Sequence, residues 1–402
     1  TLETGSDTMK IAILGAGAWG TALAIHTASR HEVSLWSRNL DVLASVRAQR
    51  VNQRYLPDVP VPEGIQMVGD LAEAVEGAEL VVMATSVAGL QPVAEALAQV
   101  LGSRTPPPSP EGPMPLREAV VTDAATASVA GGRADASGKD APAGSASFVA
   151  QAASSAAQGG SASDPFRSLT LPGIVSLAKG LQAATGRLPH QVLADALPGC
   201  AIGCLSGPSF AQEVAAGLPA ALTAASGDAA LGHQMVGAFH HSALRTYRST
   251  DIVGVEVGGA LKNIMAVATG VCDGLGLGLN ARSALLTRGL AEITRFGLAQ
   301  GAEAETFLGL AGVGDLVLTC TGDLSRNRRV GLMLAKGHSL ADILADLGHV
   351  AEGVACCPAV VARAEALQVD LPISWSVQQV IEGHLSPLDA VAALLAREPR
   401  DE

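Results

Sequence analysis

The stretch at 10–28 constrains the fold most, because it joins an apolar run to a glycine-rich turn and then to a helical pattern. The run at 11–14 is typical of a strand buried on both faces, and Gly15, Gly17 and Gly20 follow it in G-x-G-x-x-G spacing. In this context the first glycine permits a tight turn, the second lets backbone amides approach a pyrophosphate, and the third lets helix and strand pack closely. The helix N-terminus then faces the anion. The spacing therefore predicts a dinucleotide-binding domain.

A secretory signal is the alternative interpretation of the same stretch, because Met9 and Lys10 precede apolar residues. Three glycines in the apolar segment, and a second predicted strand at 32–36, argue against it. Residues 1–8 are interpreted as a leader or remnant before Met9.

Charge and hydropathy exclude several classes of partner. A formal net charge of −12 disfavours nucleic acid and anionic membranes as partners. Although 48% of the residues are hydrophobic, much of this share is alanine, and no uninterrupted run reaches the roughly 18–20 apolar residues that span a bilayer. We therefore expect a soluble protein without membrane insertion.

The six cysteines do not form a disulfide framework in a chain of 402 residues. Cys200 with Cys204, and Cys356 with Cys357, lack the two-plus-two spacing of a zinc site. We expect reduced thiols, a cytoplasmic location and no metal site.

The order of predicted elements indicates two domains. Strands and helices alternate from residue 9 to about 250, which predicts a Rossmann-like α/β domain with a parallel, doubly wound sheet. An insertion rich in alanine, serine, glycine and proline interrupts it at about 104–168, and we expect this segment to be mostly disordered because it offers few large apolar side chains. Residues 251–398 are expected to form an all-α domain. Its predicted helices are 259–271, 283–300, 304–310, 328–336, 341–347, 357–366, 374–382 and 387–396.

The end of the second predicted strand bears on the choice of cofactor. NAD-preferring folds of this type place a carboxylate about 20 residues after the glycines, where it binds the ribose 2′-hydroxyl. This chain has Arg38 there instead. An arginine suits a 2′-phosphate, which favours NADP over NAD, although a solvated arginine at a strand end explains the same residue.

Lys262 is the candidate proton-transfer group. The segment 258–268 is apolar almost all round, and Lys262 and Asn263 are its only strongly polar residues. Its neighbours on the helix include no carboxylate, so burial would lower the lysine pKa and suit it to donate and accept a proton. The alternative is a structural lysine paired with a distant carboxylate such as Glu256 or Asp315.

Three further positions suit an anionic ligand. Arg326, Arg328 and Arg329 lie beside Ser325 and Asn327 at a predicted helix start, which suits a phosphate, although a solvated basic face gives the same pattern. The segment 205–213 combines a glycine-proline turn with hydroxyl donors at the end of a predicted strand, and 179–180 follows another strand. Ligands of open α/β sheets bind at such an edge.

Taken together, these motifs resemble the NAD(P)-dependent glycerol-3-phosphate dehydrogenases of bacterial type. The matching segments are G-A-G-A-W-G-T-A-L-A at 15–24, Y-L-P-D at 55–58, A-K-G at 178–180, S-G-P-S-F-A at 206–211, G-G-A-L-K-N at 258–263, N-A-R at 280–282, G-V-G-D-L at 312–316, S-R-N at 325–327 and E-G at 352–353. They cover nearly everything except the insertion and the tail of the chain. The pattern departs at Ala84-Thr85-Ser86 and at Ala355-Cys356, which bears on the fine geometry around the cofactor.

The resemblance implies a role for each matching residue. Lys262 is the proton acceptor or donor. The residues implied at the cofactor, with the glycines of the turn included, are Gly15, Gly17, Ala18, Trp19, Gly20, Arg38, Tyr55, Lys179, Ala211, Arg326, Val350 and Glu352. The residues implied at the substrate are Lys179, Gly207, Ser209, Lys262, Asp315, Ser325, Arg326 and Asn327.

The resemblance also implies an activity: reversible hydride transfer between NAD(P)H and dihydroxyacetone phosphate, giving sn-glycerol 3-phosphate for phospholipid synthesis in a cytoplasmic homodimer. Two alternatives remain. One is a related hydroxyacid dehydrogenase, and the other is a non-catalytic NADP-binding sensor.

Overall fold

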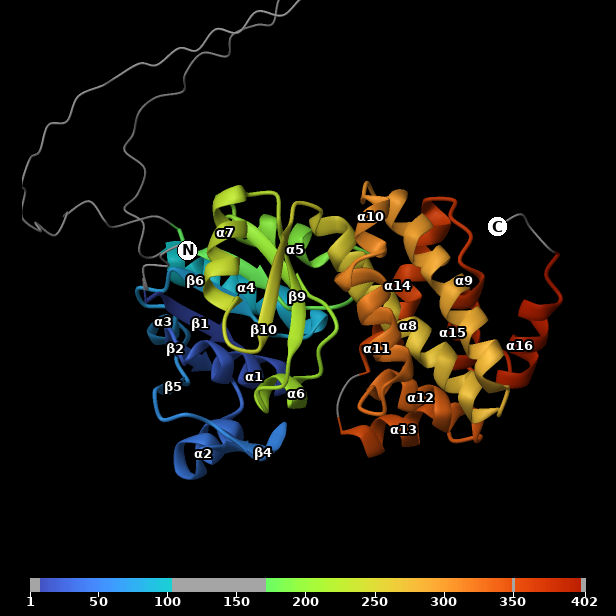
Figure 1. Ribbon diagram of the computed structural model, residues 1–402, viewed down its shortest axis with the longest axis horizontal. Coiled ribbons are helices and arrows are strands. Elements are labelled where there is room, and N and C mark those ends of the chain that lie inside the picture. Colours follow the sequence, from blue (N-terminus) through green and yellow to red (C-terminus); the bar gives the residue numbers. More distant parts are fainter. Residues whose placement is uncertain (1–7, 103–170, 349–350, 399–402) are drawn as a thin grey trace, which may run out of the picture. The chain divides into compact units, whose positions relative to one another are not determined.

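Figure 1 shows a computed structural model, which describes residues 8–102, 171–348 and 351–398. The predicted insertion at about 104–168, residues 1–7 of the predicted leader, and Val350 lie outside the described residues. The fold is α/β in the first part and helical in the second.

The first part is built on an eight-stranded sheet with the order β10-β9-β8-β7-β6-β1-β2-β5. The strands are β1 (Lys10–Leu14), β2 (Glu32–Trp36), β5 (Ile65–Val68), β6 (Leu80–Met83), β7 (Gly173–Ser176), β8 (Ile202–Ser206), β9 (Ala220–Ser226) and β10 (Leu244–Ser249). A separate ribbon pairs β3 (Val51–Asn52) with β4 (Leu56–Pro60).

The central strands are apolar along their whole length because both faces of the sheet are covered. In β1, Ile11 and Ile13 join one buried cluster, whereas Ala12 and Leu14 join another. This is the period of two that a strand imposes on its side chains. The two clusters identify the two helix layers. Helices α1 (Ala18–Thr27), α2 (Leu40–Gln49) and α7 (Ala229–Phe239) cover one face, and α3 (Leu71–Ala74), α4 (Val87–Gly102) and α5 (Pro189–Ala196) cover the other.

The prediction of a wholly parallel sheet is wrong at one strand pair. Six strands from β5 to β8 are parallel to their neighbours, but β9 runs antiparallel to β8. The connection between them contains only α6 (Ala211–Ala215). A parallel connection needs a crossover that spans the sheet, and a five-residue helix is too short for this, so the chain returns from the same edge.

The second part is organised around α8 (Ile252–Gly274), which is buried from Gly254 to Cys272. The predicted helix at 259–271 is therefore the middle of a longer one. Around it lie α9 (Gly278–Leu298), α10 (Ala304–Phe307), the π-helical turn η1 (Leu310–Gly314), α11 (Asp315–Thr321), α12 (Arg326–Ala335), α13 (Leu340–Leu347), α14 (Glu352–Ala366), α15 (Pro372–Ile381) and α16 (Pro387–Leu395). Sequence patterning did not predict α11. The helices that it did predict in this part are confirmed with shifted ends.

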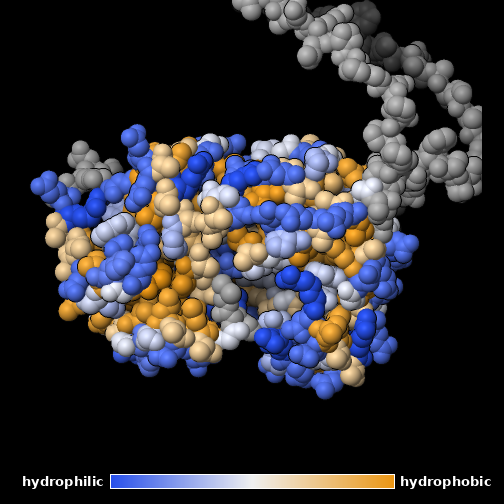
Figure 2. All heavy atoms as spheres, turned by 180° about the vertical axis from the view of Figure 1, so that it is seen from behind, coloured by the Kyte–Doolittle hydropathy of each residue, from blue (hydrophilic) through white to orange (hydrophobic). Residues whose placement is uncertain are grey.

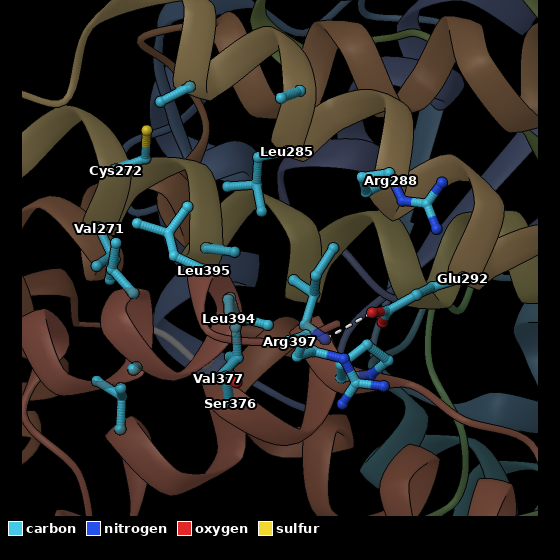
Figure 3. A pocket seen from close by; sticks show the side chains of 18 of the residues that line it. Val271, Cys272, Leu285, Arg288, Glu292, Ser376, Val377, Leu394, Leu395 and Arg397 are labelled. Atoms are coloured by element: carbon cyan, nitrogen blue, oxygen red, sulfur yellow. Dashed lines mark hydrogen bonds between the residues drawn. The ribbon is translucent and has the colours of Figure 1, made fainter. Parts of the chain in front are cut away.

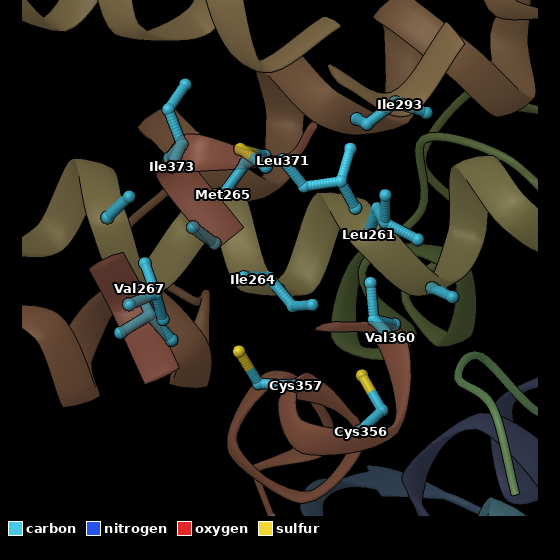
Figure 4. Close-up of a cluster of buried hydrophobic side chains, with 14 of the residues drawn as sticks. Leu261, Ile264, Met265, Val267, Ile293, Cys356, Cys357, Val360, Leu371 and Ile373 are labelled. Carbon is cyan, nitrogen blue, oxygen red and sulfur yellow. The ribbon is translucent and has the colours of Figure 1, made fainter. Parts of the chain in front are cut away.

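Apolar residues of α8 form the core of this helical part. Figure 4 shows Leu261, Ile264 and Met265 packed among side chains from α9, α14 and α15, including Ile293 and Cys357. All six cysteines are free thiols, as predicted.

Helices α8 and α12 touch through their backbones. A Cβ atom at Gly270 would overlap the carbonyl oxygen of Arg328, and one at Gly331 would overlap that of Val267. Both positions therefore require glycine for this close crossing.

The expectation that the chain has no uninterrupted apolar run of bilayer length stands for α8, because Glu256, Lys262 and Asp273 interrupt it. A helix with a few charged residues can still be long and apolar enough on average to cross a bilayer, and this holds for segments of the described residues. Two helical segments pass by length and composition, α8 and Ala304–Thr321. Within α8, 83% of the apolar window is buried inside the protein, which is typical of a core helix. The second segment contains α10, η1 and α11, with a non-helical kink at Gly312. Figure 2 shows the surface from behind, with apolar area gathered over the helical part at the left.

Candidate active site

The glycine turn between β1 and α1 has the geometry that its spacing predicts. Gly15 has φ +130, and a Cβ atom there would overlap the carbonyl oxygen of Ala84. A Cβ atom at Gly20 would overlap the carbonyl oxygen of Gly15, which is the close helix–strand contact. At Gly17, the N-cap of α1, a Cβ atom would meet nothing within 4 Å, so the helix terminus faces open space. These residues fit a dinucleotide pyrophosphate.

Asn52 supports this turn and was not anticipated from the sequence. Its buried side-chain amide donates to the carbonyl oxygen of Ala16 at 2.9 Å and to the hydroxyl oxygen of Thr21 at 2.8 Å. A bond to Ala16 cannot be read from sequence spacing, since 36 residues separate the pair.

Arg38 lies just after the end of β2 and is exposed. It occupies the position where NAD-preferring folds have a ribose-binding carboxylate. Its Nη2 lies 3.9 Å from the point where a Cβ atom of Gly89 would stand, so the guanidinium reaches the first turn of α4. Tyr55 is half-buried, with the Arg54 guanidinium 5.5 Å from its ring centre.

Two lysines and one carboxylate form a buried cluster where the sheet meets the helical part. Lys179 follows β7 and donates to Asp315 Oδ2 at 2.9 Å, while Lys262 on α8 donates to Asp315 Oδ1. Lys262 also donates to the hydroxyl oxygen of Thr319 at 2.9 Å. Lys262 is 6% exposed and Asp315 only 1%.

The charges in this cluster perturb one another. Burial lowers the pKa of Lys262 to about 7, a shift that Asp315 opposes and Lys179 reinforces. Burial also raises the pKa of Asp315, but the two ammonium groups outweigh it and hold that pKa below its usual range. An amine with a pKa near neutrality donates and accepts protons under the same conditions.

The interpretation of Lys262 as a lysine without a carboxylate partner is wrong. Asp315 pairs with it from 53 residues away, a distance that hides the contact from helix periodicity. Glu256, the other suggested partner, instead accepts from the backbone N–H of His190 at 2.9 Å and contacts His190 Nδ1 at 2.6 Å.

The carboxyl end of β8 completes this edge of the cluster. The carbonyl oxygen of Gly207 accepts from Lys179 at 3.5 Å and from the Ser209 hydroxyl at 3.0 Å. The Ser206 hydroxyl is buried and finds no hydrogen-bond partner in the described part of the chain. A Cβ atom at Gly259 would stand 3.1 Å from that hydroxyl, so α8 approaches the sheet edge closely. Lys179 lies near the same point, 3.5 Å from it through Cγ, so this orphaned buried hydroxyl marks a place for a polar ligand at the edge of the cluster.

The basic segment at the start of α12 separates into paired and unpaired arginines. Arg328 binds Asp273 at 2.7 Å and Asp323 at 3.1 Å, and Arg329 binds Asp346 at 2.7 Å. Arg326 is exposed and forms no ion pair within 4 Å with any described residue. Only Arg326 of the three is therefore disposed to bind an external anion.

Ser325 and Asn327 have structural contacts of their own. The Ser325 hydroxyl caps α12 by accepting from the Arg328 N–H at 3.3 Å. The amide of Asn327 donates to Asn263 Oδ1 and accepts from the Gly353 N–H, both at 3.0 Å. Their contacts with substrate stay a prediction.

Glu352 begins α14, and burial raises its pKa to about 7 while Arg326 lowers it. It lines a hollow of about 350 Å³ together with Ser86 at the start of α4. Ala211 opens α6, and Ala18 and Trp19 open α1, so these predicted cofactor residues lie at helix starts. Their contacts with a cofactor stay a prediction.

Sequence reasoning assigned no role to Thr319. It named Asn263 only as a polar residue of its helix, and Ser206 only as part of the 205–213 segment. Thr319 follows Asp315 by one helical turn on α11, so the spacing of four was the available signal once that helix was recognised.

A glycine turn shaped for a dinucleotide, together with a buried lysine whose pKa lies near 7, defines the class: an NAD(P)-dependent oxidoreductase with a Rossmann-type domain. Residues 10–107 and 167–232 match the family model described as NAD-dependent glycerol-3-phosphate dehydrogenase N-terminus, and residues 251–392 match its C-terminus counterpart. The chain belongs to the NAD-dependent glycerol-3-phosphate dehydrogenase family.

Similar proteins are also named glycerol-3-phosphate dehydrogenases. The glycerol-3-phosphate dehydrogenase [NAD(P)+] of Dechloromonas aromatica is 46% identical over 98% of this chain and 99% of its own length. That of Variovorax paradoxus is 48% identical over the same shares. The crystal structure of glycerol-3-phosphate dehydrogenase from Coxiella burnetii is 33% identical, covers 97% of this chain and 99% of its own, and superposes with a TM-score of 0.77.

Proposed function

We propose that this protein catalyses reversible hydride transfer between NAD(P)H and dihydroxyacetone phosphate, giving sn-glycerol 3-phosphate. The observation that carries the proposal is the Lys179–Asp315–Lys262 cluster, which the fold places at the carboxyl edge of the dinucleotide-binding sheet. The names of the similar proteins support the substrate.

Lys262 is the proton-transfer residue of this mechanism. When bound, the nicotinamide supplies a hydride to C2 of dihydroxyacetone phosphate. The C2 oxygen gains a pair of electrons as the carbonyl bond opens, and the Lys262 ammonium donates the proton that makes it a hydroxyl. In the reverse direction the neutral amine removes that proton. A pKa of about 7 lets the one residue serve both directions.

Asp315 holds both lysines at the reacting carbonyl. Its two oxygens bind one ammonium each, so the carboxylate fixes the position of Lys262 and brings Lys179 within reach of the same substrate oxygen. Positioning of this kind lowers the entropy cost of reaching the transition state.

Arg326 anchors the substrate phosphate, backed by Ser325 and Asn327 at the start of α12. The proposal rests on the arginine that makes no ion pair with the described residues, and on the positive end of the helix dipole. The binding energy of the phosphate then orients the reacting carbon.

NADP is the proposed preferred cofactor, because Arg38 occupies the place of a ribose-binding carboxylate. We also propose that the protein acts as a cytoplasmic homodimer that supplies sn-glycerol 3-phosphate for phospholipid synthesis. Light scattering coupled to size-exclusion chromatography tests the dimer directly.

One assay separates the candidate functions. NADPH oxidation is followed with dihydroxyacetone phosphate and, in parallel, with a panel of 3-keto acids, alongside cofactor binding by calorimetry. Turnover of dihydroxyacetone phosphate supports the proposal. Turnover of keto acids alone would identify a hydroxyacid dehydrogenase, and cofactor binding without any turnover would identify a sensor.

A further inference from the structure

A second cavity lies in the helical part, away from the lysine cluster. It has a volume of about 550 Å³ and is lined by residues of α8, α9, α15 and α16. Its α8 wall includes Val267 and Val271, five and nine residues after Lys262, which at 100° per residue places them about 140° and 180° round the helix from that lysine. The cavity therefore opens on the opposite side of α8 from the proposed active site, and its volume is within the range of about 300–1,000 Å³ typical of small-molecule pockets.

Apolar and charged residues are segregated along this cavity. Figure 3 shows Val271, Cys272, Leu285 and Leu395 toward one end, while Arg288, Glu292 and Arg397 gather at the other. On α9 the charged residues Arg288, Glu292 and Arg295 are spaced by four and three, so they share one helix face.

Glu292 is fixed by the protein itself. It is 1% exposed, and its oxygens accept from the N–H groups of Ile373 and Ser374 at 2.5 and 3.1 Å and from the Ser374 hydroxyl at 3.0 Å. It thereby caps the N-terminus of α15 from a neighbouring helix. Burial raises its pKa to about 7, which weakens its negative charge at neutral pH.

Two of the arginines, Arg295 and Arg397, keep donor capacity at this end. Arg295 donates Nε to the carbonyl oxygen of Asp370, and Arg397 donates Nη2 to the Asp370 carboxylate, both at 2.6 Å. Arg295 Nη2 also lies 4.0 Å from Glu292 Oε1. Each guanidinium carries five N–H donors, so these contacts do not exhaust the donors of Arg295 and Arg397. The remaining carboxylate of the lining is that of the exposed Glu398.

We propose that this cavity binds an amphiphilic anion, a hydrocarbon chain that ends in a carboxylate or phosphate, with the chain along the leucines and valines and the anionic group at the arginines. Leu395 lines the cavity and is 82% exposed, so a hydrocarbon chain in the cavity would cover its side chain.

Isothermal titration calorimetry with dodecanoate as the probe tests the proposal. We expect saturable binding at one site per chain, and no comparable binding of dodecyltrimethylammonium, which has the same chain and the opposite charge. Arg397→Ala removes a charge-assisted contact and should weaken dodecanoate binding by about tenfold or more. The matched control is Arg363→Ala, an exposed arginine of α14 outside the lining, which should bind as the wild type does.

A second variant fills the cavity. Ala284 lines it from an exposed position on α9, so Ala284→Phe should abolish binding without unfolding the chain, which its melting temperature verifies. Absence of saturable binding to the wild type, or full binding by Ala284→Phe, would overturn the proposal. So would a wild-type dimer that binds no dodecanoate and dissociates in Ala284→Phe, because the cavity would then be a subunit interface.

Discussion

Replacing Thr319 by valine tests the link between the lysine cluster and the chemistry. The Thr319 hydroxyl donates its proton to the Asp315 carbonyl oxygen at 2.6 Å, so it faces Lys262 Nζ, 2.9 Å away, as an acceptor. That hydrogen bond stabilises the ammonium, and its loss should lower the Lys262 pKa. A hydrogen bond to a charged group contributes about 1.5–3 kcal/mol, which at about 1.4 kcal/mol per unit corresponds to a fall of about 1–2 pH units.

The assay is the pH profile of kcat/KM in both directions. Reduction needs the ammonium, so in the wild type it should fall as pH rises through about 7, whereas oxidation needs the neutral amine and should rise through the same point. Thr319→Val should move both midpoints down by about 1–2 units. Thr321→Val is the control, since the Thr321 hydroxyl donates to Val317 on the same helix and contacts no lysine in the described structure. An upward shift, or unmoved midpoints with a uniform loss of rate, would refute the assignment of Lys262.

Three other substitutions address the remaining roles. Lys262→Ala should lower kcat by the ~10²–10⁴-fold typical of a lost proton-transfer group, and activity within a few-fold of the wild type would remove this lysine from the mechanism. Arg38→Ala should raise KM for NADPH more than for NADH, because a 2′-phosphate contact is lost; equal effects would show that Arg38 does not discriminate. Arg326→Ala should raise KM for dihydroxyacetone phosphate about 10- to 100-fold, whereas Arg329→Ala should have little effect because Arg329 is already paired with Asp346. Equal losses in these two variants would contradict the choice of Arg326 as anchor.

Local features of the fold could be predicted from the sequence. The glycine turn was recognisable because steric requirements act over six residues, and β2 was predicted with its observed bounds because its pattern is local. The antiparallel β9 was missed, since strand direction depends on how the chain returns after α6. Helix α11 was missed because it follows the kink at Gly312 directly.

In the candidate site, too, local features could be predicted from the sequence, whereas tertiary contacts could not. Lys262 was predicted as a buried lysine from the apolar character of its helix, but its pairing with Asp315 is a tertiary contact that periodicity does not encode. The three arginines near 326–329 looked equivalent in the sequence. Their different availability comes from Asp273, Asp323 and Asp346, which the fold brings to two of them.

The contact between Gly270 on α8 and Gly331 on α12 has a consequence for substrate selection. These helices carry the proposed proton donor and the proposed phosphate anchor, and at the crossing their main chains touch with no intervening side chain. The span between Lys262 and Arg326 is therefore set by rigid peptide geometry and should persist while side chains elsewhere in the core diverge. Because the crossing fixes this separation, the site should favour substrates with one particular distance between the carbonyl carbon and the phosphate.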